Sequence, residues 1–208
     1  MSTILQLSVK DFIRQTAAKQ PTPGGGSVAA LCGALAASLG AMALEYTVGK
    51  KAFAAHDAEI RDALAQFQRA SEMLQELMLE DVAAYETLNG LLKLPEPERR
   101  EKSEYLPAVA AAIRAPQATG GFALSVLEKC HAMLDKTNKM LISDLGIAAV
   151  YAHATVHASE MNVRVNLPLL PGGAGGEEAE TTRRGMAELC AKADGLYAAV
   201  RAEILRRV

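Results

Sequence analysis

The stretch at residues 21–43 constrains the fold of this chain more than any other segment, because it contains no charged residue. Pro23 fixes its own φ, and the three glycines at 24–26 are free to adopt positive φ. The backbone can therefore turn tightly here and approach a ligand closely. Ser27 follows as the expected N-cap of a helix. The sequence thus predicts a glycine loop that opens onto a helix N-terminus.

The helix predicted after this loop carries small residues on one face. Gly26, Gly33 and Gly40 recur every seven residues, with Ala30 and Ala37 between them at helical spacing. Such a face invites close helix packing, and the free N–H groups of the first turn suit an anion or a polar ring edge. A plain linker between helices is the alternative. A membrane span is disfavoured, because the run is built from Ala, Gly and Ser rather than Leu, Ile and Phe.

Helical periodicity continues along the rest of the chain. Helices are expected at 9–19, 27–47, 55–91, 105–114, 122–134, 141–161 and 178–206. We expect a break at Gly120 and Gly121, a short extended segment at 163–167 and a flexible loop at 171–178. No βαβ alternation occurs, which disfavours a Rossmann or P-loop fold. The prediction is one all-α domain over residues 1–208, a bundle of long helices with the glycine loop ahead of the small-residue helix.

Composition limits the classes of protein that fit. A chain of 208 residues, 50% hydrophobic and 22% charged, can bury one substantial core. A net charge of −2 gives no electrostatic reason to expect nucleic acid or an acidic membrane as a partner. Three cysteines without CxxC spacing indicate neither a disulfide framework nor a zinc ribbon. Together with an N-terminus that lacks the pattern of a secretory signal, this predicts a cytoplasmic protein.

One acidic residue falls on a face that the pattern predicts to be buried. Asp81 has Leu77 and Tyr85 one helical turn away on either side, within an apolar stripe. Glu80, by contrast, falls on the solvated face of the same helix. A carboxylate on a buried face must be paired, protonated or directed into a polar cavity. Asp81 is therefore either a structural acid inside the bundle or part of a binding pocket.

Two further groups of polar residues carry alternative interpretations. Asp144 could line a site, or it could cap the helix that begins near Leu145. His153, His157 and Glu160 form an H-x-x-x-H-x-x-E array on one helix face, which could bind a metal. The array lacks the glutamate placement of HExxH sites, so we expect a half-buried helix face and no metal.

Three segments, in one order along the chain, resemble the cyclodeaminase-domain family. This family includes formimino-tetrahydrofolate cyclodeaminases and bacterial methenyl-tetrahydrofolate cyclohydrolases. The segments are TPGGGSVAALCGALAASLGAMALEYTVGKKAF at 22–53, LEDVAAYETL at 79–88 and ISDLGIAAVYAHATVHASEMNVRVNL at 142–167. The chain departs from the family pattern at Met140, where a second Asn is common, and near Gly120, where the pattern has a proline.

The resemblance implies chemistry at the one-carbon unit that bridges N5 and N10 of tetrahydrofolate, with no cofactor and no metal. In the cyclohydrolase reaction, water adds to the methenyl carbon and the bridge opens to 10-formyl-tetrahydrofolate. Asp81 would steady the cation and take a proton from water, and Lys51 would serve as the acid. The glycine loop would bind the pterin or its tail, with Lys50 available to the glutamate carboxylates. The candidate binding residues are Pro23, Gly24, Gly25, Gly26, Ser27, Lys50, Asn138, Asp144 and Asn162.

Two other functions stay open at this point. One is a formimino-tetrahydrofolate cyclodeaminase, in which N10 attacks the formimino carbon and ammonia leaves. The other is a noncatalytic helical protein that binds folate or assembles with partners. We expect the cyclohydrolase rather than the cyclodeaminase, because no transferase segment is read beside the predicted domain, although a separate transferase could supply the cyclodeaminase substrate. The expected partners are a folate-type small molecule and further copies of this chain, as a homodimer or larger, because the small-residue face needs a close partner and the resemblance implies a subunit interface. The partner of that face could also come from the same chain.

Overall fold

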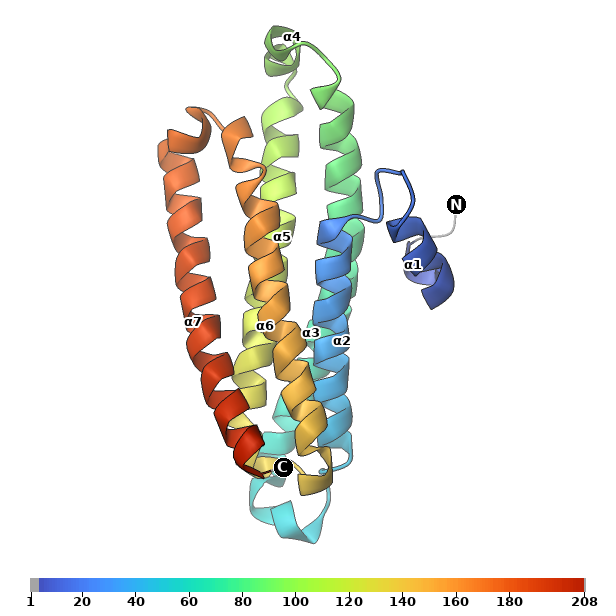
Figure 1. Ribbon diagram of the computed structural model, residues 1–208, viewed down its shortest axis with the longest axis vertical. Coiled ribbons are helices and arrows are strands. Elements are labelled where there is room, and N and C mark those ends of the chain that lie inside the picture. Colours follow the sequence, from blue (N-terminus) through green and yellow to red (C-terminus); the bar gives the residue numbers. More distant parts are fainter. Residues whose placement is uncertain (1–3, 208) are drawn as a thin grey trace.

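The computed structural model describes residues 4–207, which fold into a bundle of long helices (Figure 1). The α-helices are α1 (Val9–Thr16), α2 (Gly25–Glu45), α3 (Asp57–Leu92), α4 (Glu96–Glu101), α5 (Tyr105–Ala132), α6 (Ile142–Arg164) and α7 (Glu177–Arg207). Short 3-10 turns join them, at η1 (Ile4–Gln6), η2 (Lys51–His56), η3 (Leu134–Lys136), η4 (Lys139–Leu141), η5 (Leu167–Leu169) and η6 (Gly173–Gly175). No strand occurs in residues 4–207, so the prediction of an all-α bundle is confirmed.

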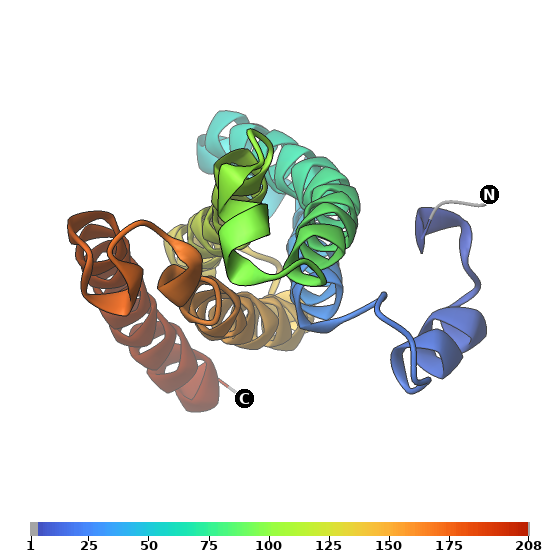
Figure 2. The same cartoon turned by 90° about the horizontal axis from the view of Figure 1, so that it is seen from above.

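Helices α2, α3, α5 and α6 enclose the core, and α7 covers α5 and α6 from outside (Figure 2). The small residues of α2 let its neighbours approach closely. A Cβ added to Gly33 would lie 3.1 Å from the side chain of Thr155 on α6, and one added to Gly40 would lie 2.8 Å from the ring of Phe67 on α3. The small-residue face therefore packs inside the chain. The close partner that this face was expected to need is therefore supplied by α3 and α6 of the same chain.

Helix α2 is apolar around most of its circumference. Its 21 residues, with a mean hydropathy of 1.9 over the most apolar part, could span a membrane by length and composition alone. However, 61% of that part is buried inside the bundle. Packing against α3 and α6 therefore buries one side of α2, while apolar Leu35 on its outward side faces solvent.

The start of α2 differs from the prediction. The helix begins at Gly25, with Gly24 in an extended conformation as its N-cap, so Ser27 lies in the first turn and does not cap it. None of the glycines at 24–26 adopts positive φ. Glycine is therefore suited to these positions because it has no side chain and leaves space for neighbouring residues, and not because it can adopt positive φ. At the other end of α2 the prediction is confirmed, since Gly49 has a φ of 73° just beyond the helix.

Two other local predictions were wrong as well. Helix α5 continues through Gly120 and Gly121 without a break. A Cβ at Gly120 would lie 3.2 Å from the Cβ of Ser159, so this glycine lets α5 and α6 pack closely. Residues 163–167 continue α6 into the turn of η5 and are not extended. The glycine-rich segment at 171–178 does lie at the surface between two helices, and it contains the short turn η6 and the first residues of α7.

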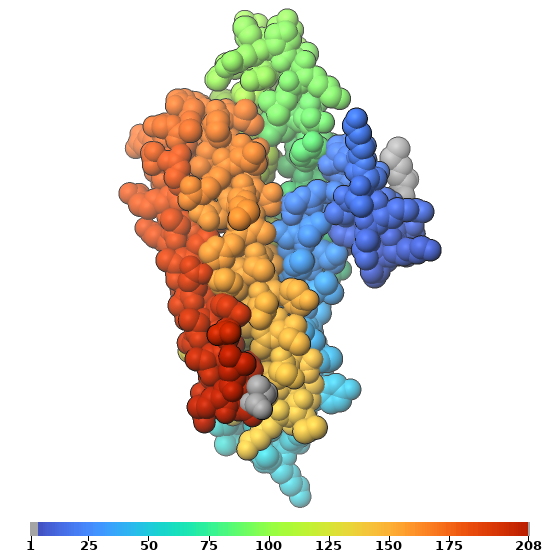
Figure 3. All heavy atoms as spheres, in the orientation of Figure 1, coloured from blue at the N-terminus to red at the C-terminus, as the bar shows by residue number. Residues whose placement is uncertain are grey.

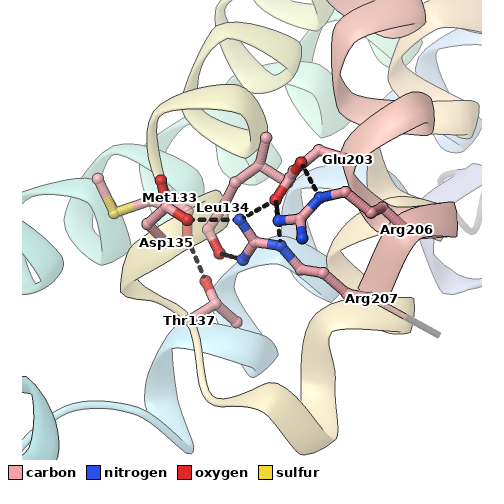
Figure 4. A network of polar contacts seen from close by, with 7 residues as sticks. All are labelled: Met133, Leu134, Asp135, Thr137, Glu203, Arg206 and Arg207. Carbon is pink, nitrogen blue, oxygen red and sulfur yellow. Dashed lines mark hydrogen bonds and ion pairs between the residues drawn. The ribbon is translucent and has the colours of Figure 1, made fainter.

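The C-terminal turn of α7 is anchored to the connection between α5 and α6 (Figure 4). The Arg207 guanidinium donates to the carbonyl oxygen of Leu134 at 2.6 Å and pairs with Asp135 and Glu203. Glu203 also accepts a hydrogen bond from Arg206 at 2.9 Å. Hydrogen bonds from Arg206 and Arg207 lower the pKa of Glu203 to about 2.

We expect Glu203→Gln to weaken this anchor in a pH-dependent way. The folded-state pKa of about 2 lies below the ordinary 4.5, so ionised Glu203 contributes stability above pH 4.5 that is lost as the pH falls toward 2. The variant should melt a few degrees below the parent at pH 7, and the difference should shrink at pH 3. Glu96→Gln removes an exposed ion pair with Arg100 on α4 and is the control. A difference in Tm that is the same at both pH values would contradict the prediction.

Candidate active site

A pocket of about 260 Å³ lies at the end of the bundle where α2 begins. Four helices meet there, and each contributes to the wall. The lining residues are Pro21, Thr22, Gly24, Gly25, Gly26, Asp81, Tyr85, Leu88, Ala112, Pro116, Asn162, Val165 and Asn166. The pocket thus brings together the glycine loop, the acidic residue of α3, Asn162 of α6 and Asn166 just after α6, although these segments are far apart in the sequence.

Asp81 is a half-buried carboxylate that faces the N-terminus of α2. Its Oδ2 accepts a hydrogen bond from the hydroxyl of Ser27 at 3.1 Å, and Ser27 itself is fully buried. A Cβ at Gly26 would lie 1.9 Å from the Oδ1 of Asp81, far inside the contact limit. Glycine at this position therefore makes room for the carboxylate.

The surroundings of Asp81 make it a stronger base than an exposed aspartate. Burial raises the pKa of Asp81, and hydrogen bonds from the hydroxyl and backbone N–H of Ser27 offset part of that rise. A carboxylate whose pKa is shifted toward neutrality is better suited to accept a proton in a reaction. Its neighbour Glu80 is exposed, as the helical pattern predicts.

A proline fixes the opposite wall of the pocket. Pro116 lies inside α5 and has no N–H, so the carbonyl oxygen of Ala112 lacks its helical donor. The Nδ2 of Asn166 donates to that oxygen at 3.1 Å and also to the carbonyl oxygen of Asn162 at 3.1 Å. Asn166 thereby ties the end of α6 to α5. The sequence reasoning missed Pro116, although a proline inside a helical pattern was the signal for it.

Asn162 faces the glycine loop. Its Oδ1 lies 3.3 Å from the position that a Cβ at Gly25 would occupy. The side chain of Asn162 and the backbone of the loop therefore border the same space. Among the predicted binding residues, this places Asn162 with the three glycines and Asp81, while Pro23 is buried directly before the loop.

The remaining predicted residues lie at the opposite end of the bundle. Lys50 and Lys51 are exposed after the C-terminal end of α2, and the backbone N–H of Asn138 bonds to that same end, to a threonine hydroxyl at 3.0 Å. Asp144 is in the first turn of α6, where it makes no side-chain cap. The 21 residues of α2 separate the two groups by about 30 Å. One chain alone therefore does not bring Lys51 to Asp81.

A larger groove of about 600 Å³ lies between α3 and α5. Alanines make up much of its wall, and its charged residues are Glu80, Glu104 and Arg114. The smaller pocket is the better candidate because a carboxylate, two amides and a helix N-terminus converge on it, as catalysis requires.

The family of this chain follows from a family model that matches most of its length. The Formiminotransferase-cyclodeaminase family model matches residues 8–183, and the chain belongs to this family. The resemblance seen in the sequence is therefore confirmed.

The similarity to individual members of the family extends over different shares of each protein. It is 28% identical over 202 residues to the methenyltetrahydrofolate cyclohydrolase of Methylorubrum extorquens, a match that covers 95% of this chain and 97% of that protein. It is 33% identical over 175 residues to the formimidoyltransferase-cyclodeaminase of Rattus norvegicus, covering 79% of this chain but only 31% of the rat protein. The crystal structure of formiminotetrahydrofolate cyclodeaminase from Thermotoga maritima superposes with a TM-score of 0.82, at 27% identity, over 97% of this chain and 98% of that chain.

Proposed function

We propose that this protein is a cytoplasmic methenyl-tetrahydrofolate cyclohydrolase, which hydrolyses the methenyl bridge to 10-formyl-tetrahydrofolate in one-carbon metabolism. The observation that carries the proposal is the half-buried carboxylate of Asp81, which lines a pocket bounded by the glycine loop. The similarity to the Methylorubrum cyclohydrolase extends over nearly all of both chains, which supports this reaction. The Thermotoga cyclodeaminase is matched over an equal share, so cyclodeamination is the second candidate. The rat relative, by contrast, is matched over only part of its length.

The reaction requires only charge stabilisation and proton transfer from the protein, and it involves no change of oxidation state. The methenyl carbon carries positive charge shared with N5 and N10, which the negative charge of Asp81 stabilises. Water attacks this carbon and gives one proton to the Asp81 carboxylate, which leaves a neutral hydroxyl adduct. The adduct then loses its hydroxyl proton, the bond from carbon to N5 breaks, and N5 takes up a proton. The formyl group stays on N10, and one proton is released overall.

An assay with three outcomes tests the function. Purified protein is mixed with methenyl-tetrahydrofolate, and the loss of its absorbance is followed against the rate without protein. We expect hydrolysis well above that rate. If the protein instead releases ammonia from formimino-tetrahydrofolate and leaves the methenyl compound unchanged, it is a cyclodeaminase. If it accelerates neither reaction, the bundle is a noncatalytic scaffold, and the proposal fails in both cases.

We further propose that the protein acts as a homodimer that pairs through the outer side of α2 and α6. These two helices pack side by side, and both carry large apolar side chains that face solvent. A surface of this kind marks an interaction site, because a helix that is apolar all round needs cover on every side. The residues, all at least 43% exposed, are Leu35, Tyr46, Ile147, Val150, Tyr151, Met161 and Val165.

Helix α1 supports the same arrangement. It stands away from the bundle beside the start of α2 (Figure 3), and none of its residues is buried. Val9 and Ile13, one turn apart on the same face, are 79% and 64% exposed. A second copy seated on α2 and α6 would offer this apolar face a surface to cover.

Dimerisation also gives the distant candidate residues a role. A twofold axis perpendicular to α2 would make the two copies of this helix antiparallel and bring the far end of one chain beside the pocket of the other. Lys50, Lys51, Asn138 and Asp144 all lie at that far end. The pocket of one chain, at about 260 Å³, is also smaller than the 300–1,000 Å³ typical of ligand sites. We propose that the site is completed by the second chain, which supplies Lys51 as the acid.

Mixed dimers test this shared site. Asp81→Asn and Lys51→Ala are each expected to be inactive alone. Coexpressed, they should form heterodimers in which one of the two sites has both native residues, so about a quarter of parental activity returns. Coexpression of Asp81→Asn with the Asp81→Asn/Lys51→Ala double variant is the control and should restore nothing. A lack of recovery in the first mixture, or light scattering that shows only a 22.0 kDa species, would rule out the shared site.

A further inference from the structure

A second cluster of reactive side chains lies between α6 and α7, apart from the Asp81 pocket. His153 and His157 are four residues apart on α6 and so project from one face, and α7 sets Asp194 opposite them. The Nε2 atoms of His153 and His157 lie 2.7 and 2.9 Å from the same oxygen, Oδ1 of Asp194. Three atoms that commonly bind metals thus converge on one point, all within 4.8 Å of one another.

The cluster is held in position and open to solvent. The ring of His153 stacks on that of Tyr197, with centroids 4.5 Å apart and planes 21° apart, and it also contacts the ring of His157. The side chains of His153 and His157 are 23% and 33% exposed, and that of Asp194 is 57% exposed. An ion could therefore enter without rearrangement of the core, and water could complete its coordination.

We propose that His153, His157 and Asp194 bind a divalent transition metal ion of the zinc type, with water as a fourth ligand. Two imidazoles and a carboxylate form a donor set that suits zinc, and three protein ligands leave one position open. Ligand atoms around tetrahedral zinc are about 3.3 Å apart, so the two nitrogen–oxygen separations of 2.7 and 2.9 Å would each widen by about half an ångström. The ion would sit where hydrogen bonds now link the three side chains, and it would join α6 to α7.

A second possible metal position, deeper in the protein and beside the same cluster, is less suitable for an ion. The potential ligand atoms of His157, Glu160 and Cys190 also lie within 4.8 Å of one another. However, Glu160 is paired with Arg164 at 2.6 Å, and the Cys190 thiol is 3.6 Å from Glu160 in a largely buried position. An ion there would have to displace Arg164 from its carboxylate. The exposed set with Asp194 needs no such change.

The sequence pattern alone led to the opposite expectation, that this helix face binds no metal. The H-x-x-x-H-x-x-E array supplies two good ligands, but its glutamate is engaged by Arg164. The third ligand comes from α7, 37 residues after His157, and only the packing of α7 on α6 reveals it.

Zinc titration of the full chain tests the proposal. Chelator-treated protein is titrated with ZnCl₂ in an isothermal calorimeter, and we expect one ion per chain. His153→Gln, His157→Gln and Asp194→Asn should each weaken zinc binding by about tenfold or more. The other two of the four histidines give matched controls, and His56→Gln and His131→Gln should bind zinc like the parent. Zinc should also raise the Tm of the parent and leave that of His157→Gln unchanged.

Further variants distinguish the two positions and separate this site from the proposed reaction. Glu160→Gln and Cys190→Ser should retain zinc binding, and a loss in either variant would overturn the assignment of Asp194 as a ligand. Binding that is not stoichiometric, or that all three ligand variants retain, would overturn the site itself. The rate of methenyl-tetrahydrofolate hydrolysis should be the same in the Asp194→Asn variant as in the parent, so the result stands independently of the proposed function.

Discussion

Asp81→Asn is expected to abolish hydrolysis of methenyl-tetrahydrofolate while leaving the bundle folded. Asparagine keeps the shape of the side chain and can still accept the hydrogen bond from Ser27, but it has neither the negative charge nor the basicity. Loss of a general base costs about 10²–10⁴ in rate, and more if the charge also stabilises the cation. Because burial disfavours the ionised form of Asp81, the neutral amide should not lower the Tm. Turnover and thermal melting of the purified variant provide the two measurements.

The adjacent carboxylate provides the control for this prediction. Glu80 is exposed, so Glu80→Gln should leave both turnover and Tm close to those of the parent. The pH profile adds a second check, because the proposed mechanism needs ionised Asp81. Its raised pKa places the loss of activity on acidification at a higher pH than an ordinary aspartate would. If Glu80→Gln stopped turnover and Asp81→Asn did not, the catalytic base would have been assigned to the wrong residue.

Helical periodicity alone predicted the class of fold and the buried side of α3. Asp81 was singled out because residues one turn away on either side are apolar, and the structure places its carboxylate in a pocket. Its partner could not be read from the sequence, since Ser27 is 54 residues away and the two meet only when α2 packs on α3. Periodicity is a local property of a helix, whereas a site depends on which helices become neighbours.

The structural roles of the glycines were the least accurate of the predictions from the sequence. At Gly26 the pattern indicated freedom to take positive φ, and at Gly120 it indicated a helix break. In the structure both lie inside helices, where they admit the Asp81 carboxylate and the Ser159 side chain. Glycine serves a tight turn or a close contact equally well, and the two uses cannot be told apart without the neighbouring element.

The position of Lys50 and Lys51 relative to Asp81 could not be predicted from the sequence. Lys50 and Lys51 fall within the segment that resembles the family, yet they lie at the far end of α2 from Asp81. The sequence resemblance implied that these lysines and Asp81 belong to one site, but it does not say whether they would come from one chain or from two. The apolar outer side of α2 and α6 supplies a physical reason to expect two.

Gly26→Ala is expected to cause the second large loss of activity. The added Cβ would lie 1.9 Å from Oδ1 and 2.4 Å from Cγ of Asp81, so the carboxylate must move away from Ser27. A displacement of about 1 Å of a catalytic group can cost 10²-fold in rate, and overpacking of this kind costs about 1–3 kcal/mol of stability. We expect both effects, measured as turnover and as the free energy of unfolding in urea. Gly25→Ala, whose Cβ would meet only Asn162 at 3.3 Å, should have a smaller effect.

Two comparisons isolate the clash with Asp81 as the cause. Gly121→Ala makes the same change inside α5, where a Cβ has open space, and it should stabilise the protein by about 0.5–1 kcal/mol without changing turnover. Asp81→Ala removes the atoms that the new methyl group meets. In that background Gly26→Ala should no longer destabilise the fold, so the two substitutions should be strongly non-additive. Additive effects would mean that Gly26 is needed for the backbone of α2 and not to make room for the carboxylate.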